Sequence, residues 1–255
     1  MGKILKKKPL IEAIFELRWK LETNSQGASF DGSYSFIPGL FFNKVRELFP
    51  IHIQLPTSAV PAEMIPFSPQ YQFRKEEKKW PVIQLGPGIL TLNETENYKW
   101  DNDFEGLCKY VFSSFQEVYP DSDKLEIIDL RLRYLNYLPI DNSNVMDLLK
   151  EKLKIQISLP KDLFNKEISD NPAGFQHIFS FPVLNPKGTF LIKLQNGSVK
   201  GVQSVIWELQ FISTFQNSMK DEKDFSEWLI DAHRIIEDSF FTLIEGDLLR
   251  SFENG

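Results

Sequence analysis

The chain has 255 residues, of which 42% are hydrophobic and 13% aromatic, and its formal net charge is −6. This composition is typical of a globular protein with a sizeable core and excludes a disordered chain. No apolar run approaches the roughly 20 residues of a membrane-spanning helix, and no signal-peptide pattern follows the basic N-terminus. We therefore expect a cytoplasmic protein without membrane contact. A single cysteine, Cys108, excludes an intrachain disulfide and a cysteine-rich zinc site.

Residues 1–140 are expected to fold as a ferredoxin-like unit, because their predicted elements run strand, helix, strand, strand, helix, strand. Apolar and polar side chains alternate in the first segment, as in a half-buried strand. Proline punctuates the boundaries, and the second helix is expected to begin at an Asp103 N-cap. The predicted elements are a strand at 10–20, a helix at 38–49, an irregular proline-rich connection at 50–70, a hairpin at 71–75 and 80–85, a strand at 89–93, a helix at 103–119 and a strand at 127–138.

Residues 141–255 are expected to form a second α+β half of the order helix, three strands, helix. The long C-terminal helix is predicted to begin at Asp224, where Glu227 completes a capping-box-like start. The only boundary signal between the halves is a short turn at 141–144. One continuous antiparallel sheet, covered by helices on one face, is therefore the preferred alternative to two separate domains. The predicted elements are a helix at 145–153, strands at 175–184, 189–195 and 204–214, and a helix from 224 onward.

Four sequence blocks carry a resemblance to a known family. They are Pro9–Trp19, Pro81–Asn93, Asp129–Asn136 and the tail Asp231–His233 with Phe240. Together, over nearly the whole chain, they resemble a sporadically distributed, uncharacterised prokaryotic family of similar length. The resemblance implies no assigned activity. The patchy distribution of that family implies an accessory gene of a defence, toxin–antitoxin or mobile locus.

The strand at 127–138 places Arg131 and Arg133 on one face and Tyr134 on the other. In a ferredoxin-like sheet this strand pairs with the first one, whose polar face carries Glu12 and Glu16. Two arginines on an open face are able to hold a carboxylate or phosphate bidentately. The alternative, which we favour, is an ion-pair lattice between these acids and arginines that solvates the sheet face.

The Gly86-Pro87-Gly88 bend brings backbone close to its surroundings, but Pro87 lacks a donor and no phosphate-binding Lys-Ser/Thr pair follows. We interpret the bend as a bulge or corner that redirects the strand. Gln84 and Asn93 flank it, either as amide contacts for a ligand or as partners of the bent backbone.

No motif in the chain predicts a catalytic or metal site. His233 and Glu237 have helical i, i+4 spacing, but His233 lies beside an apolar stripe and is interpreted as a core residue. Cys108 is interpreted as inert packing. We therefore expect no cofactor and no metal.

Three functions stay open. The first is a non-enzymatic binding or regulatory protein that contacts a protein partner or itself, through a sheet edge or through an interaction loop formed by Ile53, Leu55, Met64 and Phe67. The second is an RNA-binding or RNA-processing protein that uses Arg131, Arg133, Tyr134 and the basic N-terminal Lys3, Lys6, Lys7 and Lys8; the acidic net charge argues against it. The third is a small-ligand sensor built around Trp207, Trp228 and Phe240.

Overall fold

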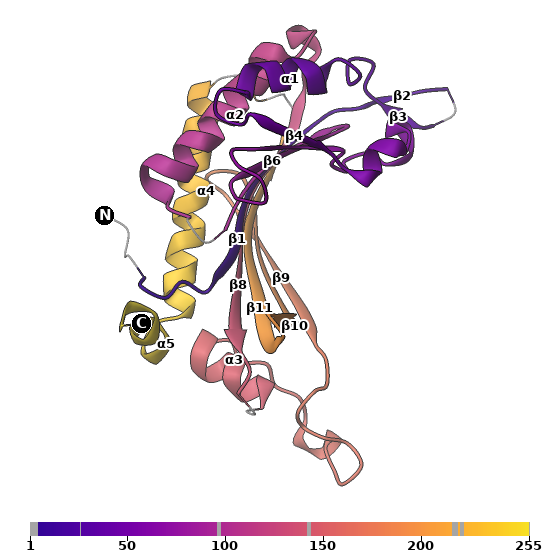
Figure 1. Ribbon diagram of the computed structural model, residues 1–255. Helices are drawn as coiled ribbons and strands as arrows, with labels where there is room; N and C mark the ends of the chain where they lie inside the picture. Colours follow the sequence, from indigo (N-terminus) through magenta and orange to yellow (C-terminus); the bar gives the residue numbers. More distant parts are fainter. Residues whose placement is uncertain are drawn as a thin grey trace.

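The computed structural model describes residues 5–25, 27–95, 98–141, 144–215, 219 and 222–254 (Figure 1). Nine strands form one sheet in the order β4-β5-β6-β7-β1-β8-β11-β10-β9, with antiparallel neighbours throughout. The strands of this sheet are β1 (Leu10–Trp19), β4 (Ile51–Gln54), β5 (Tyr71–Arg74), β6 (Val82–Gly86), β7 (Ile89–Glu94), β8 (Ile127–Pro139), β9 (Gln176–Val183), β10 (Gly188–Val199) and β11 (Val202–Thr214), and a separate small hairpin pairs β2 (Glu22–Thr23) with β3 (Ser29–Phe30).

Five α-helices complete the described chain: α1 (Ile37–Val45), α2 (Glu105–Val118), α3 (Val145–Leu153), α4 (Glu222–Leu243) and α5 (Asp247–Asn254). The protein is therefore a mixed α+β protein with one large antiparallel sheet, as predicted. The nine strands do not confirm the ferredoxin-like ordering as such, because strands of both predicted halves belong to the same sheet. Of the turn proposed as the boundary between the halves, residues 142 and 143 lie outside the described residues.

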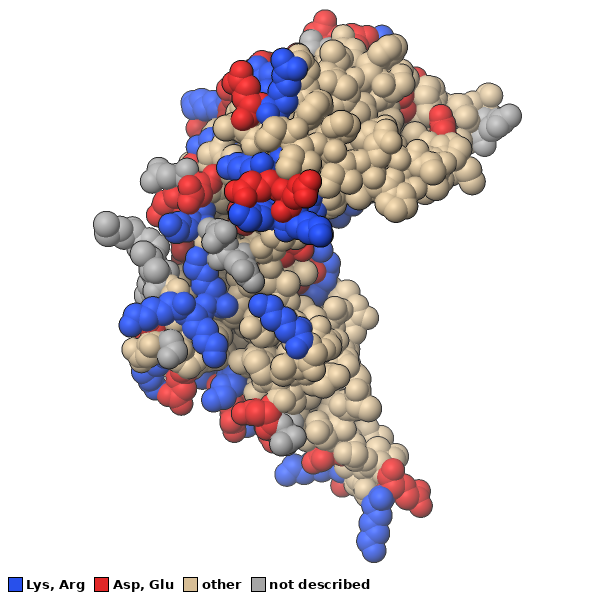
Figure 2. All heavy atoms as spheres, viewed as in Figure 1, with Lys and Arg blue, Asp and Glu red and all other residues tan. Residues whose placement is uncertain are grey.

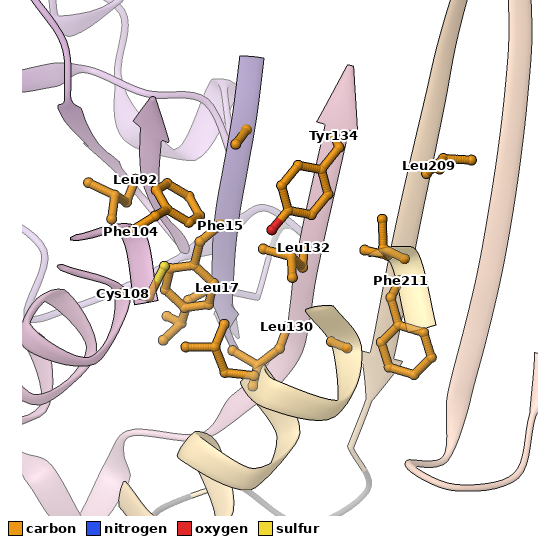
Figure 3. Close-up of a cluster of buried hydrophobic side chains, with 14 of the residues drawn as sticks. Phe15, Leu17, Leu92, Phe104, Cys108, Leu130, Leu132, Tyr134, Leu209 and Phe211 are labelled. Atoms are coloured by element: carbon orange, nitrogen blue, oxygen red, sulfur yellow. The ribbon is translucent and has the colours of Figure 1, made fainter. Parts of the chain in front are cut away.

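The core lies between the sheet and the helices on one of its faces (Figures 1 and 3). Phe15 of β1 packs against Phe225 of α4, and Phe225 stacks on Phe112 of α2 with ring centroids 3.8 Å apart. Nearby, Trp19 of β1 contacts Phe115 of α2. These side chains are fully or almost fully buried, because alternate residues of each strand point to the same face and helical residues with 3.6-residue spacing meet them there.

Several element boundaries differ from the predictions. The connection at 50–70 contains β4, which extends the sheet by pairing with β5. The helix expected from an Asp103 N-cap is preceded by a π-helical turn from Trp100, so Asp103 lies inside the turn and caps nothing. Likewise α4 already runs at Glu222, which places Asp224 in its first turn. The local signals located the helices, and the exact starts differ by a few residues; before α2, the Phe104 amide donates to the Lys99 carbonyl and closes the π-helical turn.

Candidate functional site

The sheet face that carries no helix gathers four of the five predicted binding residues. Cross-strand pairing aligns Thr91 with both Gln84 and Glu16, and Glu16 in turn with Arg131. The next row aligns Asn93 with Ile14, Ile14 with Arg133 and Arg133 with Gln210. Because side chains directly opposite each other in a sheet share a face, Gln84, Asn93, Arg131 and Arg133 all project from this open face.

The arginines of the open face are engaged by carboxylates. Arg131 donates two hydrogen bonds to Asp129, at 2.7 and 2.8 Å, and lies 3.6 Å from Glu16. Arg133 donates to Glu208 at 2.7 Å, and Arg18 donates to Glu16 at 2.6 Å. The hydrogen bonds to Asp129 raise the pKa of Arg131 above its ordinary value, so the guanidinium stays charged. An ion-pair lattice is present, but its close acids are Asp129 and Glu208 and not the predicted Glu12 and Glu16. Glu16 lies 3.6 and 3.9 Å from the two arginines, and Glu12 accepts from Asn93 instead. Acids of three strands thus use the donors that a bound anion would need.

The predicted amide pair is also held by the sheet. The Asn93 side-chain amide donates to Glu12 at 2.7 Å and accepts from the Thr91 hydroxyl at 2.7 Å. Asn93 is buried, whereas Gln84 on the neighbouring strand is half-buried. Asn93 therefore satisfies polar neighbours on the sheet and is not directed at an open site.

Tyr134 lies on the opposite, helix-covered face, where it joins a buried polar cluster. The Tyr98 hydroxyl donates to the Tyr134 hydroxyl at 2.8 Å, and Tyr134 lies 3.0 Å from Nδ1 of His233. Trp100 stacks on the His233 ring with centroids 3.6 Å apart. The sequence analysis interpreted His233 only as a core residue. The sequence contained no local signal for these partners, because Tyr134 lies 99 positions and Trp100 133 positions away along the chain.

Burial sets the protonation states of this cluster. It lowers the pKa of His233 to about 3 and raises the pKa of Tyr134 well above its usual range. His233 is therefore neutral at pH 7, and its Nδ1 shares a hydrogen bond with the Tyr134 hydroxyl. Its Nε2 lies 3.8 Å from Glu237, a carboxyl whose pKa burial raises. A chain of neutral groups in this geometry stabilises the packing of α4 on β8.

The Gly86-Pro87-Gly88 segment is a tight hairpin turn between β6 and β7 rather than a bulge. Gly88 has φ +80, which glycine adopts without strain. Gly86 is required for another reason: a Cβ there would lie 2.0 Å from the carbonyl oxygen of Ser68. The proline-rich connection therefore packs directly on the turn, and the Phe67 amide donates to the Pro87 carbonyl at 2.7 Å.

Because the connection packs on this turn, the residues of the predicted interaction loop differ in their exposure. Phe67 is half-buried, with the Arg18 guanidinium 5.1 Å from its ring centroid, and Leu55 is half-buried as well. Ile53 lies in β4 with 38% of its surface exposed, and Met64 is 73% exposed. The structure does not bring the four residues together as one exposed apolar loop.

The largest concentration of exposed apolar side chains lies elsewhere, at residues 158–184, which we call the arm-and-edge surface. It consists of the arm, residues 158–171, which extends from the end of the sheet in Figure 1, and the edge strand β9 with Leu184. Leu184 is 92% exposed. Of the 14 exposed large hydrophobic residues in the described part of the chain, seven fall within this stretch, namely Leu159, Leu163, Ile168, Ile178, Phe179, Phe181 and Leu184. Sequence analysis missed it, although residues 171–186 contain no Asp, Glu, Lys or Arg, in a chain that is 25% charged.

Other candidate sites offer little room or reactivity. A cavity of about 240 Å³ lies between Lys75, Trp80, Glu94 and Phe104, and its size is below that of most small-molecule sites. The three aromatic residues of the ligand-sensor hypothesis belong to the packing: Trp207 and Trp228 are buried, and Trp207 stacks with Phe240. Burial raises the pKa of the Cys108 thiol, so it is not a nucleophile at neutral pH.

Within the residues that the structure describes, no three His, Cys, Asp or Glu side chains lie together as metal ligands. Within the same part of the chain, no helix is long and apolar enough to cross a bilayer.

The basic N-terminus is partly tied to the body of the protein. The Lys7 amide donates to the Phe252 carbonyl at 3.0 Å, and the Lys8 ammonium donates to the Tyr98 carbonyl. Burial, and then the neighbouring Lys99, lowers the pKa of Lys8. Lys3 lies outside the described residues.

No protein-family model matches the chain, and no curated protein matches it significantly.

Proposed function

We propose that this protein is a non-enzymatic binding protein of an accessory locus, of the defence or toxin–antitoxin kind, and that it acts through protein–protein contacts. The observation that carries the proposal is the arm-and-edge surface. Half of the exposed large hydrophobic residues of the described chain lie within 158–184. Exposed apolar side chains concentrated in one region are typical of an interface with another protein. The accessory locus rests on the resemblance of the four sequence blocks alone.

The electrostatics of the sheet support a protein partner over RNA. The open face pairs Arg131 with Asp129 and Arg133 with Glu208, so a phosphate would have to compete with carboxylates already in contact. The β9 edge, in contrast, has no charged side chain between residues 171 and 186, whereas the arm carries Lys161, Asp162, Lys166, Glu167 and Asp170. Figure 2 shows the side formed by the lower strands largely free of Lys, Arg, Asp and Glu above the tip of the arm. A neutral apolar surface offers nothing to a nucleic-acid backbone.

We further infer a ferredoxin-like unit within the sheet, built from β8, β1, β7 and β6 with α1 and α2. Its support is the order of these four strands, in which β1 lies between β7 and β8, and β7 lies between β1 and β6. With antiparallel neighbours, β1 and β6 run parallel, as the split β-α-β arrangement requires. On this interpretation, β9 to β11 extend the unit and carry the interaction surface.

A tagged pull-down from the native host tests the proposed function, with each lysate divided into nuclease-treated and untreated portions. The expected result is a stoichiometric protein partner that survives nuclease and is lost in the double variant Leu159→Asp/Leu163→Asp. Met64→Asp is the matched control, because Met64 is the more exposed side chain and lies outside the surface. Loss of the partner in Met64→Asp alone would move the interface to the proline-rich loop. A nuclease-sensitive eluate rich in RNA, unchanged by the arm variant, would overturn the proposal.

A further inference from the structure

The edge strand β9 presents unused hydrogen-bonding groups. The Phe175 carbonyl accepts a hydrogen bond from the Asn196 amide of β10, so odd-numbered residues of this strand face β10. Pro182, opposite Thr189, has no N–H to give, which fits an even position turned away from β10. By the alternation of an antiparallel ladder, the N–H and C=O groups of Gln176, Ile178 and Ser180 point away from the sheet.

Edge strands usually carry features that prevent pairing with another chain, and the two edges of this sheet differ in them. The β4 edge is only four residues long. The β9 edge is eight residues long and has no charged side chain. Pro182 removes one outward-facing N–H group, but only near the end of the strand. A long, uncharged, apolar edge is a template for a further strand.

The β9 edge is complementary to itself. If two copies pair antiparallel about a two-fold axis at Ile178, Ile178 meets its own counterpart and Gln176 meets Ser180 on both sides of the axis. All three outward-facing residues of each copy are then paired, whereas centring the axis on Ser180 places Pro182 opposite Ile178 and loses a donor. The same register sets His177 opposite Phe179 and Phe175 opposite Phe181, and such aromatic cross-strand pairs stabilise a sheet.

This register also gives the exposed apolar side chains of the arm a contact in the second copy. In an antiparallel pair, the residues that precede β9 in one copy lie beside the residues that follow β9 in the other. The arm of each copy, with its exposed Leu159, Leu163 and Ile168, therefore approaches Leu184 of the second copy, the most exposed large hydrophobic residue of the described chain at 92%. Because residues 171–186 are uncharged, the paired strands bring together no like charges, although each chain carries a net charge of −6.

We infer that a second copy of this chain docks on β9, pairing antiparallel about a two-fold axis at Ile178 and joining two nine-stranded sheets into one. The inference rests on the proposed function, since it names the partner of the arm-and-edge surface. The contact has the form of an isologous interface, in which the same strand serves both subunits.

Light scattering on the purified full chain during gel filtration tests the inference. We expect a dimer dissociation constant of about 1 μM or below. At roughly 100 μM, the wild type should therefore elute mainly as a dimer. Ser180→Pro removes one outward-facing N–H without touching the bonds to β10, and is expected to weaken the dimer at least about tenfold. Ser180→Ala keeps the N–H and is the matched control, expected to remain a dimer. Circular dichroism and Tm check that Ser180→Pro retains its fold.

A charge exchange tests the register without depending on proline. Ile178→Lys and Ile178→Glu each place like charges on the two-fold axis, so each variant alone is expected to be a monomer. Mixed in equal amounts, they are expected to form a heterodimer through a Lys–Glu pair across the axis. A monomeric wild type, a Ser180→Pro dimer as stable as wild type, or a mixture that stays monomeric would overturn the inference.

These outcomes separate the two proposals. A monomeric chain that still captures a host protein through its arm would sink the inference and leave the proposed function standing. If the chain is a dimer but its arm variant captures the same host proteins as wild type, the inference stands and the proposed function fails.

Discussion

One strand, β8, contributes to two very different faces of the sheet. Its residues Leu130, Leu132 and Tyr134 are buried under helices, while Arg131 and Arg133, between them in sequence, form ion pairs on the open face. Packing density and excluded water make each buried side chain contribute more to stability than one of these partly buried ion pairs. The comparison teaches that adjacent residues of one strand serve different purposes: one set holds the fold together, and the other keeps its second face hydrated.

The largest effect is expected from truncation on the helix-covered face. Phe15→Ala removes a ring that is fully buried against Phe225, and should lower the free energy of unfolding by about 3–5 kcal/mol. Phe181→Ala is the matched control, because the same side chain is 47% exposed on the edge strand and should lose less than about 1 kcal/mol in the monomer. Urea denaturation measures both, and equal losses would contradict the assignment of the core to one face.

The next effect concerns Gly86, where the proline-rich connection packs on the open face beside the β6–β7 turn. Gly86→Ala places a Cβ 2.0 Å from the Ser68 carbonyl oxygen, so the connection must move, at a cost of about 1–3 kcal/mol. Gly39→Ala, within α1 and without neighbours inside 4 Å, should instead stabilise by about 0.5–1 kcal/mol. Thermal denaturation distinguishes the two signs, and a neutral Gly86→Ala would argue against the close packing of this turn.

A pH dependence is expected from His233, whose pKa is about 3 in the folded protein against 6.5 when exposed. Between these values the unfolded chain binds the proton and the folded one does not. Stability is therefore complete above pH 6.5 and falls as the pH drops toward 3, with a slope of up to about 1.4 kcal/mol per pH unit. His233→Asn keeps an acceptor for Tyr134 and does not titrate.

The measurement is Tm or urea midpoint against pH from 7 to 4 for both proteins, because carboxylates common to both cancel in the difference. The variant should be less stable at pH 7 and show a shallower decline. Parallel curves would mean that His233 titrates normally and is not buried as a neutral ring.

The smallest effect is expected on the open face. Arg133→Gln breaks the contact with Glu208 and should cost about 0.2–1 kcal/mol, less at high salt. Lys20→Gln, which breaks a more exposed pair with Glu126, should be close to neutral. A loss of several kcal/mol at Arg133 would mean that the lattice is a structural element of the core. Loss of RNA binding on charge reversal of Arg131 and Arg133 would instead revive the RNA hypothesis.

Local patterns predicted the individual strands and helices well. The alternation in β1 and β8 indicated which side chains share a face, and the predicted pairing of these strands is confirmed. Their register places Glu16 opposite Arg131, but Glu12 opposite Leu135 and not an arginine. Helix α3 has the predicted bounds, since its apolar spacing and Asn144, whose side chain accepts from the Met146 amide, are both local signals. In contrast, β4 was hidden among prolines, because its strand character depends on pairing with β5.

The candidate sites followed the same division. Four predicted binding residues, Arg131, Arg133, Gln84 and Asn93, lie on one face of the sheet. Carboxylates of neighbouring positions bind Arg131, Arg133 and Asn93 there, so these three residues belong to a polar network of the sheet itself. The arm-and-edge surface was not predicted, although the uncharged run at 171–186 is visible in the sequence. That run indicates a strand or a buried segment, and only the position of β9 at the end of the sheet leaves it exposed.

By itself, the sequence determined the class of protein, the faces of its main strands and helices, and the residue types available to each face. These follow from side-chain periods of 2 and 3.6 residues, which neighbouring residues encode. The tertiary structure alone decided the strand order, the two edges, the approach of Ser68 to Gly86 and the pairing of His233 with Tyr134. Those depend on contacts between residues distant in the chain, which form only when the whole sheet closes on its core, and no local period carries them.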